Sequence, residues 1–230
     1  CGADVSWQAQ FDDSLADRPL FLVANEFFDA LPVRQYVRSE RGWHERMVTA
    51  LDGELDFALA PVPVPLPIIP QDRETAPQGG VYETSPAALA LAENIAAIVT
   101  QRGGAALMVD YGYDAVTGFA ETLQAVGGHR FADVLAAPGD DDLSAHVDFA
   151  ALAQAGRRGG AAVFGPVTQG ALLASIGITE RAEQLMKLHP DSAADLLSAT
   201  ERLIGADQMG KLFKALAFAP PGVAGFAGFA

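Results

Sequence analysis

Polar side chains follow a short apolar run near the beginning of the chain. Residues 20–24 are all apolar, and Asn25, Glu26 and Asp29 come soon after them. An uninterrupted apolar run of this length is typical of a strand that is buried on both faces of a parallel sheet. Ligands of open α/β sheets bind beyond the carboxyl ends of such strands. The spacing therefore predicts that these three side chains border an active site.

A second apolar run ends in the same manner. Residues 105–109 are followed by Asp110, Tyr111 and Tyr113, which would line the same crevice. Tyrosine rings at that place could bind a cationic group through their faces. The alternative interpretation is that the rings are buried and pack a loop.

His146 and Gln169 are two further candidates. His146 follows the acidic run 140–142 and could act as a general base or hydrogen-bond a substrate, although a ring satisfied by nearby backbone is the commoner outcome. Gln169 lies in a predicted strand-to-helix turn, where it could contact a substrate or a partner. The sequence has neither clustered Cys and His nor an HExxH pattern, and no serine lies in a nucleophile elbow. Neither a metal site nor a hydrolase is therefore predicted.

Composition argues against several classes of function. Half of the 230 residues are hydrophobic, which is enough for a sizeable core, and the formal net charge is −14. Because phosphate backbones recruit Lys and Arg, no nucleic-acid partner is expected, whereas the acidity suits a cationic partner or solubility alone. Cys1 is the only cysteine, which excludes an intrachain disulfide and favours a reducing compartment. No secretory signal is visible, and no membrane span is expected because no apolar run is long enough.

The segment between the two apolar runs has a different pattern. Alternating residues around an Asp52-Gly53 turn predict an antiparallel meander over residues 34–59. The prolines of residues 61–70 predict a stiff, extended connector, with a ligand for a proline-binding domain as the alternative. Both features indicate an insertion that projects from the main sheet.

Helices and strands alternate in the rest of the chain. Ser85 caps a predicted helix that begins with Pro86 and ends before Gly103 and Gly104. Further helices are predicted around residues 119–126, 149–155, 171–176, 180–188 and 193–204, and further strands at 161–164 and 211–218. This alternation predicts an α/β protein with a mostly parallel sheet.

Six short motifs, in this order along the chain, resemble those of the MidA-like methyltransferases, whose mitochondrial member is a complex I assembly factor. They are NEFFDALP (25–32), YETSPAA (82–88), VDYGY (109–113), SAHVDF (144–149), GPVTQG (165–170) and MGKLFK (209–214). The resemblance extends over about residues 13–218. It implies an enzyme that uses S-adenosylmethionine (SAM) as its cofactor.

The resemblance also implies an architecture. The fold would be α/β, the C-terminal part of a Rossmann-like class I methyltransferase sheet, with an inserted antiparallel meander and extra C-terminal helices. The expected divisions are core (1–33), meander and connector (34–80), remaining core with a helical substrate or partner region (81–219) and tail (220–230). The family's glycine-rich SAM loop has no equivalent in this sequence. The chain is therefore interpreted as part of a longer protein, from which two βα units of about 60 residues are missing.

The resemblance suggests a role for each candidate near the cofactor. An arginine acceptor is always cationic and must approach a positive sulfonium, so carboxylates would bind and neutralise it. Glu26 is the first candidate for this clamp, and a turn cap or an ion pair with Arg34 is its alternative role. Asp29 is the second candidate, and an acid that only caps a turn is the alternative there. Asn25 would support the methionine end of the cofactor or shape the turn.

Asp13, Ser14 and Leu15 occupy the place along the chain where related enzymes hold the adenine, and a solvated turn is the alternative. His146 completes the expected catalytic set. The expected substrate-binding residues are Asp110, Tyr111, Tyr113 and Gln169.

The resemblance finally implies a function for the full-length protein, namely arginine methylation of a protein, with a homologue of the complex I 49 kDa subunit as the candidate substrate. A homodimer could form. One alternative is a non-catalytic assembly or binding protein on a degenerate methyltransferase fold, and another is a small-molecule methyltransferase. The expected location is the bacterial cytoplasm, or the mitochondrial matrix if the protein is eukaryotic.

Overall fold

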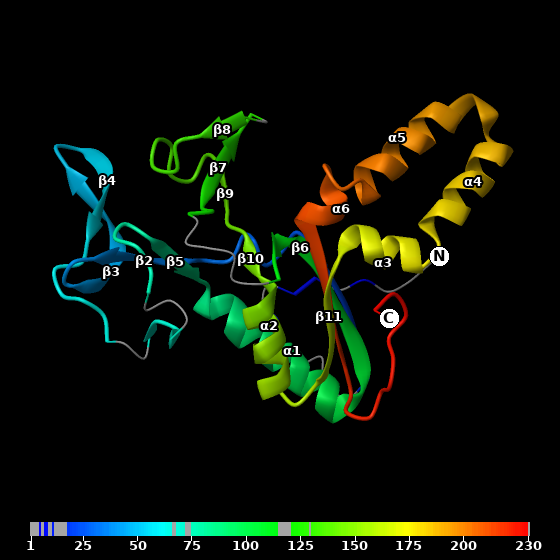
Figure 1. Ribbon diagram of the computed structural model, residues 1–230, viewed down its shortest axis with the longest axis horizontal. Coiled ribbons are helices and arrows are strands. Elements are labelled where there is room, and N and C mark those ends of the chain that lie inside the picture. Colours follow the sequence, from blue (N-terminus) through cyan, green and yellow to red (C-terminus); the bar gives the residue numbers. More distant parts are fainter. Residues whose placement is uncertain are drawn as a thin grey trace.

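The computed structural model describes residues 5, 7–8, 11, 18–65, 68–71, 75–114, 121–128 and 130–229. The predicted adenine contacts at Asp13, Ser14 and Leu15 lie outside the described residues. Figure 1 shows a central sheet with helices around it, an antiparallel sheet at one end and a helical hairpin at the other.

The central sheet has the strand order β1-β6-β12-β11, and β10 pairs with the far end of β6. Its strands are β1 (Leu20–Asn25), β6 (Gly104–Tyr113), β10 (Val147–Asp148), β11 (Ala162–Thr168) and β12 (Phe213–Ala219). β1 and β10 run parallel to β6, whereas β12 is antiparallel to both β6 and β11. β1, β6 and β11 therefore share one direction, and β12 alone is reversed. The predicted α/β class is confirmed.

Helices α1 (Pro86–Arg102) and α2 (Phe149–Arg158) cover one face of this sheet (Figure 1). The core beneath them includes Ile95 of α1, Phe149 of α2 and Phe218 of β12, all almost fully buried. Side chains alternate along a strand, so neighbouring residues of β12 point to opposite faces of the sheet. The sequence of β12, which is apolar but for one lysine, fits a strand buried on both sides.

The start of α1 was predicted correctly. The hydroxyl of Ser85 accepts a hydrogen bond from the N–H of Ala88 at 3.2 Å, and Pro86 is the first helical residue. Gly103 ends the helix with φ of 82°, a backbone conformation that glycine adopts at little cost.

The antiparallel sheet has the order β4-β3-β2-β5. The predicted meander forms β2 (Arg34–Ser39), β3 (Gly42–Leu51) and β4 (Glu54–Leu59), and β5 (Val81–Thr84) adds a strand that the sequence did not indicate. Asp52 and Gly53 both have positive φ, as a two-residue hairpin turn requires. Tyr36, Trp43 and Ile69 form a separate small core here.

The helix expected around residues 119–126 is wrong. Residues 124–127 instead form β7 (Gln124–Gly127) in a small sheet with β8 (Arg130–Ala132) and β9 (Asp142–Ser144). Gly127, part of the predicted helix stop, is the last residue of β7 and pairs with Arg130 of β8, and Gly128 begins the turn that follows. A glycine pair suits both roles, and four residues are too few for periodicity to decide between them.

The remaining helices are α3 (Gln169–Ser175), α4 (Ile178–Leu188), α5 (Ala193–Ile204) and the short α6 (Met209–Leu212). α3 packs against the second face of the central sheet through Leu172, which contacts the cluster containing Val109 and Ala215. α4 and α5 extend away from the sheet as a hairpin (Figure 1). The last strand begins at Phe213, two residues later than predicted, because α6 occupies the preceding positions.

Candidate functional site

The parallel pairing of β1 and β6 brings the two polar clusters together. Asn25 is opposite Val109, so the turn after β1 lies beside Asp110. Gly112 permits the third element to approach, because a Cβ at this position would lie 2.1 Å from the carbonyl oxygen of Val147 in β10. The carboxyl ends of β1 and β6 therefore meet at one edge of the sheet, as predicted, and β10, which was not predicted, pairs with β6 there.

Asp110 is buried beneath the turn that follows β1. One carboxylate oxygen accepts hydrogen bonds from the backbone N–H groups of Phe27, Phe28 and Asp29 at 3.1, 3.0 and 3.3 Å. The other oxygen accepts from the N–H of Tyr111 at 2.9 Å. Burial and the nearby charge of Asp29 raise the pKa of Asp110 to about 6, although these hydrogen bonds act in the opposite direction. Asp110, expected to contact substrate, thus binds the backbone of the turn.

Asp29 is also buried, but its side chain is only half satisfied. Oδ2 accepts a hydrogen bond from the hydroxyl of Tyr111, whereas Oδ1 is buried and has no partner among the described residues. Burial and the hydrogen bond to Asp29 both raise the pKa of Tyr111, so its hydroxyl stays protonated and keeps donating. A buried oxygen without a donor is costly, and it suits a donor group on a bound molecule.

Glu26 lies at the exposed bend between β1 and this turn. Its backbone has φ of 48°, and its N–H donates to the carbonyl of Val109 at 3.1 Å. Nδ2 of Asn25 donates to Glu26 Oε1 at 3.4 Å. Arg34, the alternative partner for Glu26, forms its ion pair with Glu45 at 3.5 Å.

Asn25 and Glu26 border an open groove beside the end of β1, with a volume of about 460 Å³. Apolar side chains form much of the rest of its wall, among them Phe27, Leu91 and Ile95. Polar groups at the rim of an apolar groove are typical of a small-molecule site.

His146 is half-buried on the other side of Tyr111. The two rings meet edge to face, with centroids 5.6 Å apart. Burial lowers the pKa of His146, Glu83 partly opposes this effect and Lys214 adds to it. The ring is therefore largely neutral at pH 7 and able to accept a proton.

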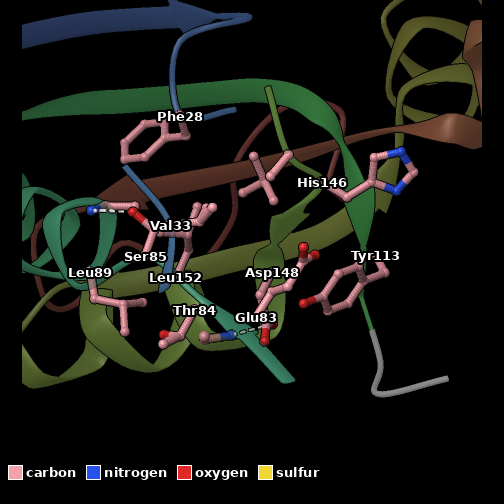
Figure 2. A pocket seen from close by; sticks show the side chains of 14 residues that line it. Phe28, Val33, Glu83, Thr84, Ser85, Leu89, Tyr113, His146, Asp148 and Leu152 are labelled. Atoms are coloured by element: carbon pink, nitrogen blue, oxygen red, sulfur yellow. Dashed lines mark hydrogen bonds between the residues drawn. The ribbon is translucent and has the colours of Figure 1, made fainter. Parts of the chain in front are cut away.

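Tyr113 lies with His146, Glu83 and Asp148 around a cavity of about 30 Å³, enough for one water molecule (Figure 2). Gln169, by contrast, is engaged in the helical region, where its Nε2 donates to the carbonyl of Leu203 at 2.9 Å.

Sequence reasoning gave no role to two buried charged residues near the site. Lys214 donates to the carbonyls of Lys211 at 2.6 Å and Gly112 at 3.3 Å, and burial lowers its pKa. Glu83 accepts hydrogen bonds from two separate segments. Both residues lie within the motifs that resemble the methyltransferase family, and this was the only indication of a role. Their partners come from distant parts of the sequence and could not be predicted.

A parallel-containing α/β sheet whose polar site lies at the carboxyl ends of its strands is the architecture of many nucleotide- and cofactor-binding enzymes. The sequence of residues 1–167 matches a family model described as "Putative S-adenosyl-L-methionine-dependent methyltransferase". The chain belongs to this family, and the predicted resemblance is confirmed.

Two relatives are both called protein arginine methyltransferase NDUFAF7, mitochondrial. The Mus musculus protein is 34% identical over 95% of this chain and 50% of its own length, and the Homo sapiens protein is 33% identical over 95% and 49%. The chain therefore spans about half the length of these relatives.

A similar solved structure is a COG1565 superfamily member from Burkholderia thailandensis bound to S-adenosyl-homocysteine. It is 31% identical, with a TM-score of 0.85 over 96% of this chain and 59% of that chain.

Two further observations apply to the described part of the chain. Its acidic, histidine and cysteine side chains form no group of three or more that could hold a metal ion. None of its helices is both long and apolar enough to cross a membrane.

Proposed function

We propose that the complete protein is a SAM-dependent protein arginine methyltransferase and that this chain supplies the acceptor half of its site. The observation that supports it best is the buried, unpartnered Oδ1 of Asp29 at the carboxyl ends of the strands. A guanidinium carries five N–H donors in a planar fork and is always charged, so it matches an acceptor of this kind.

The residues present fit one side of a cofactor site. The groove beside Asn25 and Glu26 combines an apolar wall with polar atoms at its rim. We place the methionine end of SAM at Asn25, and the adenine near Asp13, Ser14 and Leu15, which lie outside the described residues. When bound, SAM supplies an activated methyl group.

This chain's own residues prepare the acceptor. Glu26 and Asp29 bind the guanidinium and offset its charge, which would otherwise repel a cationic cofactor. The Tyr111 hydroxyl fixes the orientation of the Asp29 carboxylate. His146, neutral at pH 7, accepts the proton that the acceptor nitrogen loses. Holding the acceptor in line supplies most of the rate, because such a transfer needs little covalent help.

The test is methylation of an arginine peptide by the full-length protein, followed by mass spectrometry. Glu26→Gln and Asp29→Asn should each lower kcat by about 100-fold, because each removes a charge that stabilises the reacting groups, while the Kd for SAM changes little. Glu93→Gln on α1, whose exposed side chain pairs with Arg158, is the matched control and should retain wild-type activity. If both site variants kept wild-type turnover, Glu26 and Asp29 would not bind the guanidinium as proposed.

The substrate, partners and location are part of the same proposal. The relatives' names support a protein substrate, for which a homologue of the complex I 49 kDa subunit is the candidate. The meander 34–59 and the terminal helices would provide the partner surface. The insertion would comprise residues 34–80, the core residues 1–33 and 81–219, and the tail residues 220–230. A homodimer could form. The relatives are mitochondrial, so the matrix or the bacterial cytoplasm is the proposed location.

Two alternatives predict other results in the same assay. A non-catalytic assembly protein would bind a partner but transfer no methyl group to any acceptor. A small-molecule methyltransferase would modify free guanidino or amino compounds and ignore peptides. The half-satisfied Asp29 favours the enzyme, because an assembly role alone gives no reason to keep a buried oxygen unpaired.

A further inference from the structure

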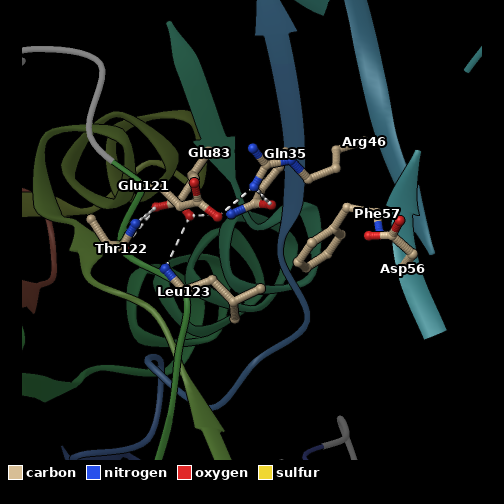
Figure 3. A network of polar contacts seen from close by, with 8 residues as sticks. All are labelled: Gln35, Arg46, Asp56, Phe57, Glu83, Glu121, Thr122 and Leu123. Carbon is tan, nitrogen blue, oxygen red and sulfur yellow. Dashed lines mark hydrogen bonds and ion pairs between the residues drawn. The ribbon is translucent and has the colours of Figure 1, made fainter. Parts of the chain in front are cut away.

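Glu83 is a buried carboxylate that the proposed mechanism does not use. It lies on β5 and accepts hydrogen bonds from two segments (Figure 3). Oε1 accepts from Nε2 of Gln35 at 2.7 Å and from the N–H of Leu123 at 3.1 Å. Oε2 accepts from the N–H of Thr122 at 3.0 Å and from the Thr122 hydroxyl. A carboxylate withdrawn from water requires this many donors, so it fixes the groups that provide them.

Thr122 extends this constraint to His146. Its hydroxyl, which donates to Glu83, also accepts from the N–H of His146 at 2.9 Å. The N–H of the preceding residue, Ala145, donates to the carbonyl of Asp29 at 3.0 Å. Two adjacent backbone groups therefore connect the turn of Asp29 with Thr122, and the position of His146 depends on both.

The same network reaches the antiparallel sheet on its other side. Nη1 of Arg46 on β3 donates to Oε1 of Gln35 at 3.1 Å and forms an ion pair with Glu121. The guanidinium carbon of Arg46 lies 5.1 Å from the centroid of the Phe57 ring on β4 (Figure 3). Residues 121–123 are thus bound to this sheet through Arg46 and through Glu83.

We propose that Glu83 is a positioning residue for the acceptor site, which through Thr122 holds His146 against Tyr111 and so keeps Asp29 oriented. This inference rests on the proposed function, in which Asp29 and His146 touch the acceptor. It also makes the antiparallel sheet a controlling element, because a partner that displaced β2 or β5 would disturb the donors of Glu83.

Thr122→Val in the full-length protein is the most selective test. Valine has nearly the shape of threonine but neither donates to Glu83 nor accepts from His146, while the charge of Glu83 is retained. We expect kcat for the arginine peptide to fall about 10- to 100-fold, because small misplacements of reacting groups have effects of this size. The Kd for SAM should stay within about threefold of wild type. Thr122→Ser keeps the hydroxyl and should retain most of the wild-type kcat.

Glu83→Gln tests the carboxylate itself. The glutamine amide would place its N–H groups against the donors that one carboxylate oxygen of Glu83 accepts from. The loss of kcat should therefore equal that of Thr122→Val. Glu93→Gln is the matched control, because Glu93 makes an exposed ion pair with Arg158 at 3.0 Å outside this network. Assays should be run well below the melting temperature of every variant, so that reduced stability is not read as reduced turnover.

A readout without turnover separates this inference from the proposed function. The ring signals of His146 in NMR spectra of histidine-labelled protein, assigned with a His146→Asn variant, report its contact with Tyr111. We expect these signals to shift in Thr122→Val and in Glu83→Gln but not in Glu93→Gln. If wild type methylates no arginine, the proposed function fails, and the NMR result still decides the positioning role. Unchanged His146 signals in Thr122→Val would overturn that role, whatever the activity.

Discussion

Asp110 binds the backbone of the turn after β1, and its burial there makes the stability of the protein depend on pH. Its pKa is raised from 3.8 to about 6, chiefly by burial and then by the charge of Asp29. The folded state therefore holds this proton more tightly than the unfolded chain does. The contribution of Asp110 to stability is fully present below pH 3.8 and is lost as the pH rises through about 6.

The variant Asp110→Asn resembles the protonated acid at every pH and exposes this effect. Both proteins should be unfolded in urea at about pH 4 and pH 7, because the titration of distant groups then cancels in the difference, and only the coupling with Asp29 remains part of the measured effect. The displacement of the pKa corresponds to at most about 3 kcal/mol, so wild type should lose up to this amount relative to the variant over that range. If the stability difference between the two proteins did not change with pH, the backbone N–H groups would balance burial. If it grew in favour of wild type with rising pH, they would outweigh burial.

The helix α1 depends on one side chain at its start. The Ser85 hydroxyl accepts from the N–H of Ala88 and donates to the carbonyl of Pro32 at 2.8 Å, so it joins the helix to the loop after the Asp29 turn. We expect Ser85→Ala to lower the free energy of unfolding by about 1–2 kcal/mol, measured by urea denaturation. Ser85→Thr keeps both hydrogen bonds and should stay close to wild type. Equal stability of all three proteins would mean that water replaces this cap.

The elements that could be predicted from sequence are those with strong local signals. Residues 20–24 and 105–109 are strands as expected. The predicted burial of residues 20–24 on both faces is wrong, because Phe21 and Val23 are exposed in β1. β5 was missed because four residues are too few to show alternation. The edge of the sheet where the site lies followed from these strands, since their carboxyl ends had to meet.

The roles of single residues could not be predicted in the same way. Asp110 lies more than 80 positions from the backbone groups that it binds, and Glu83 is about 40 positions from Thr122. Such pairs are set by the register of strands and by turns, which leave no pattern in a single sequence. Residue types near a strand end therefore indicate a candidate site, but not which carboxylate would bind a ligand and which binds backbone.

At the scale of the whole molecule, β1 has an edge that could pair with a further strand. Among the described strands only β6 pairs with it, and Phe21 and Val23 are 81% and 75% exposed. A strand with one open edge and exposed apolar side chains is a site for added structure. The relatives are about twice as long as this chain, and in the proposed complete protein the additional residues would cover this edge.

This open edge makes SAM binding a test of the whole arrangement. In the proposed function the groove at Asn25 and Glu26 forms one side of the SAM site. Residues 1–230 alone should then bind SAM at least about 100-fold more weakly than a chain extended at its N-terminus to the relatives' length. Isothermal calorimetry on both proteins measures this, with circular dichroism as the control that both are folded. Tight binding by the shorter chain would mean that the described groove is nearly the complete site. Absence of binding by the longer one would favour the assembly protein over the enzyme, because Asp29 would then have no methyl donor to serve.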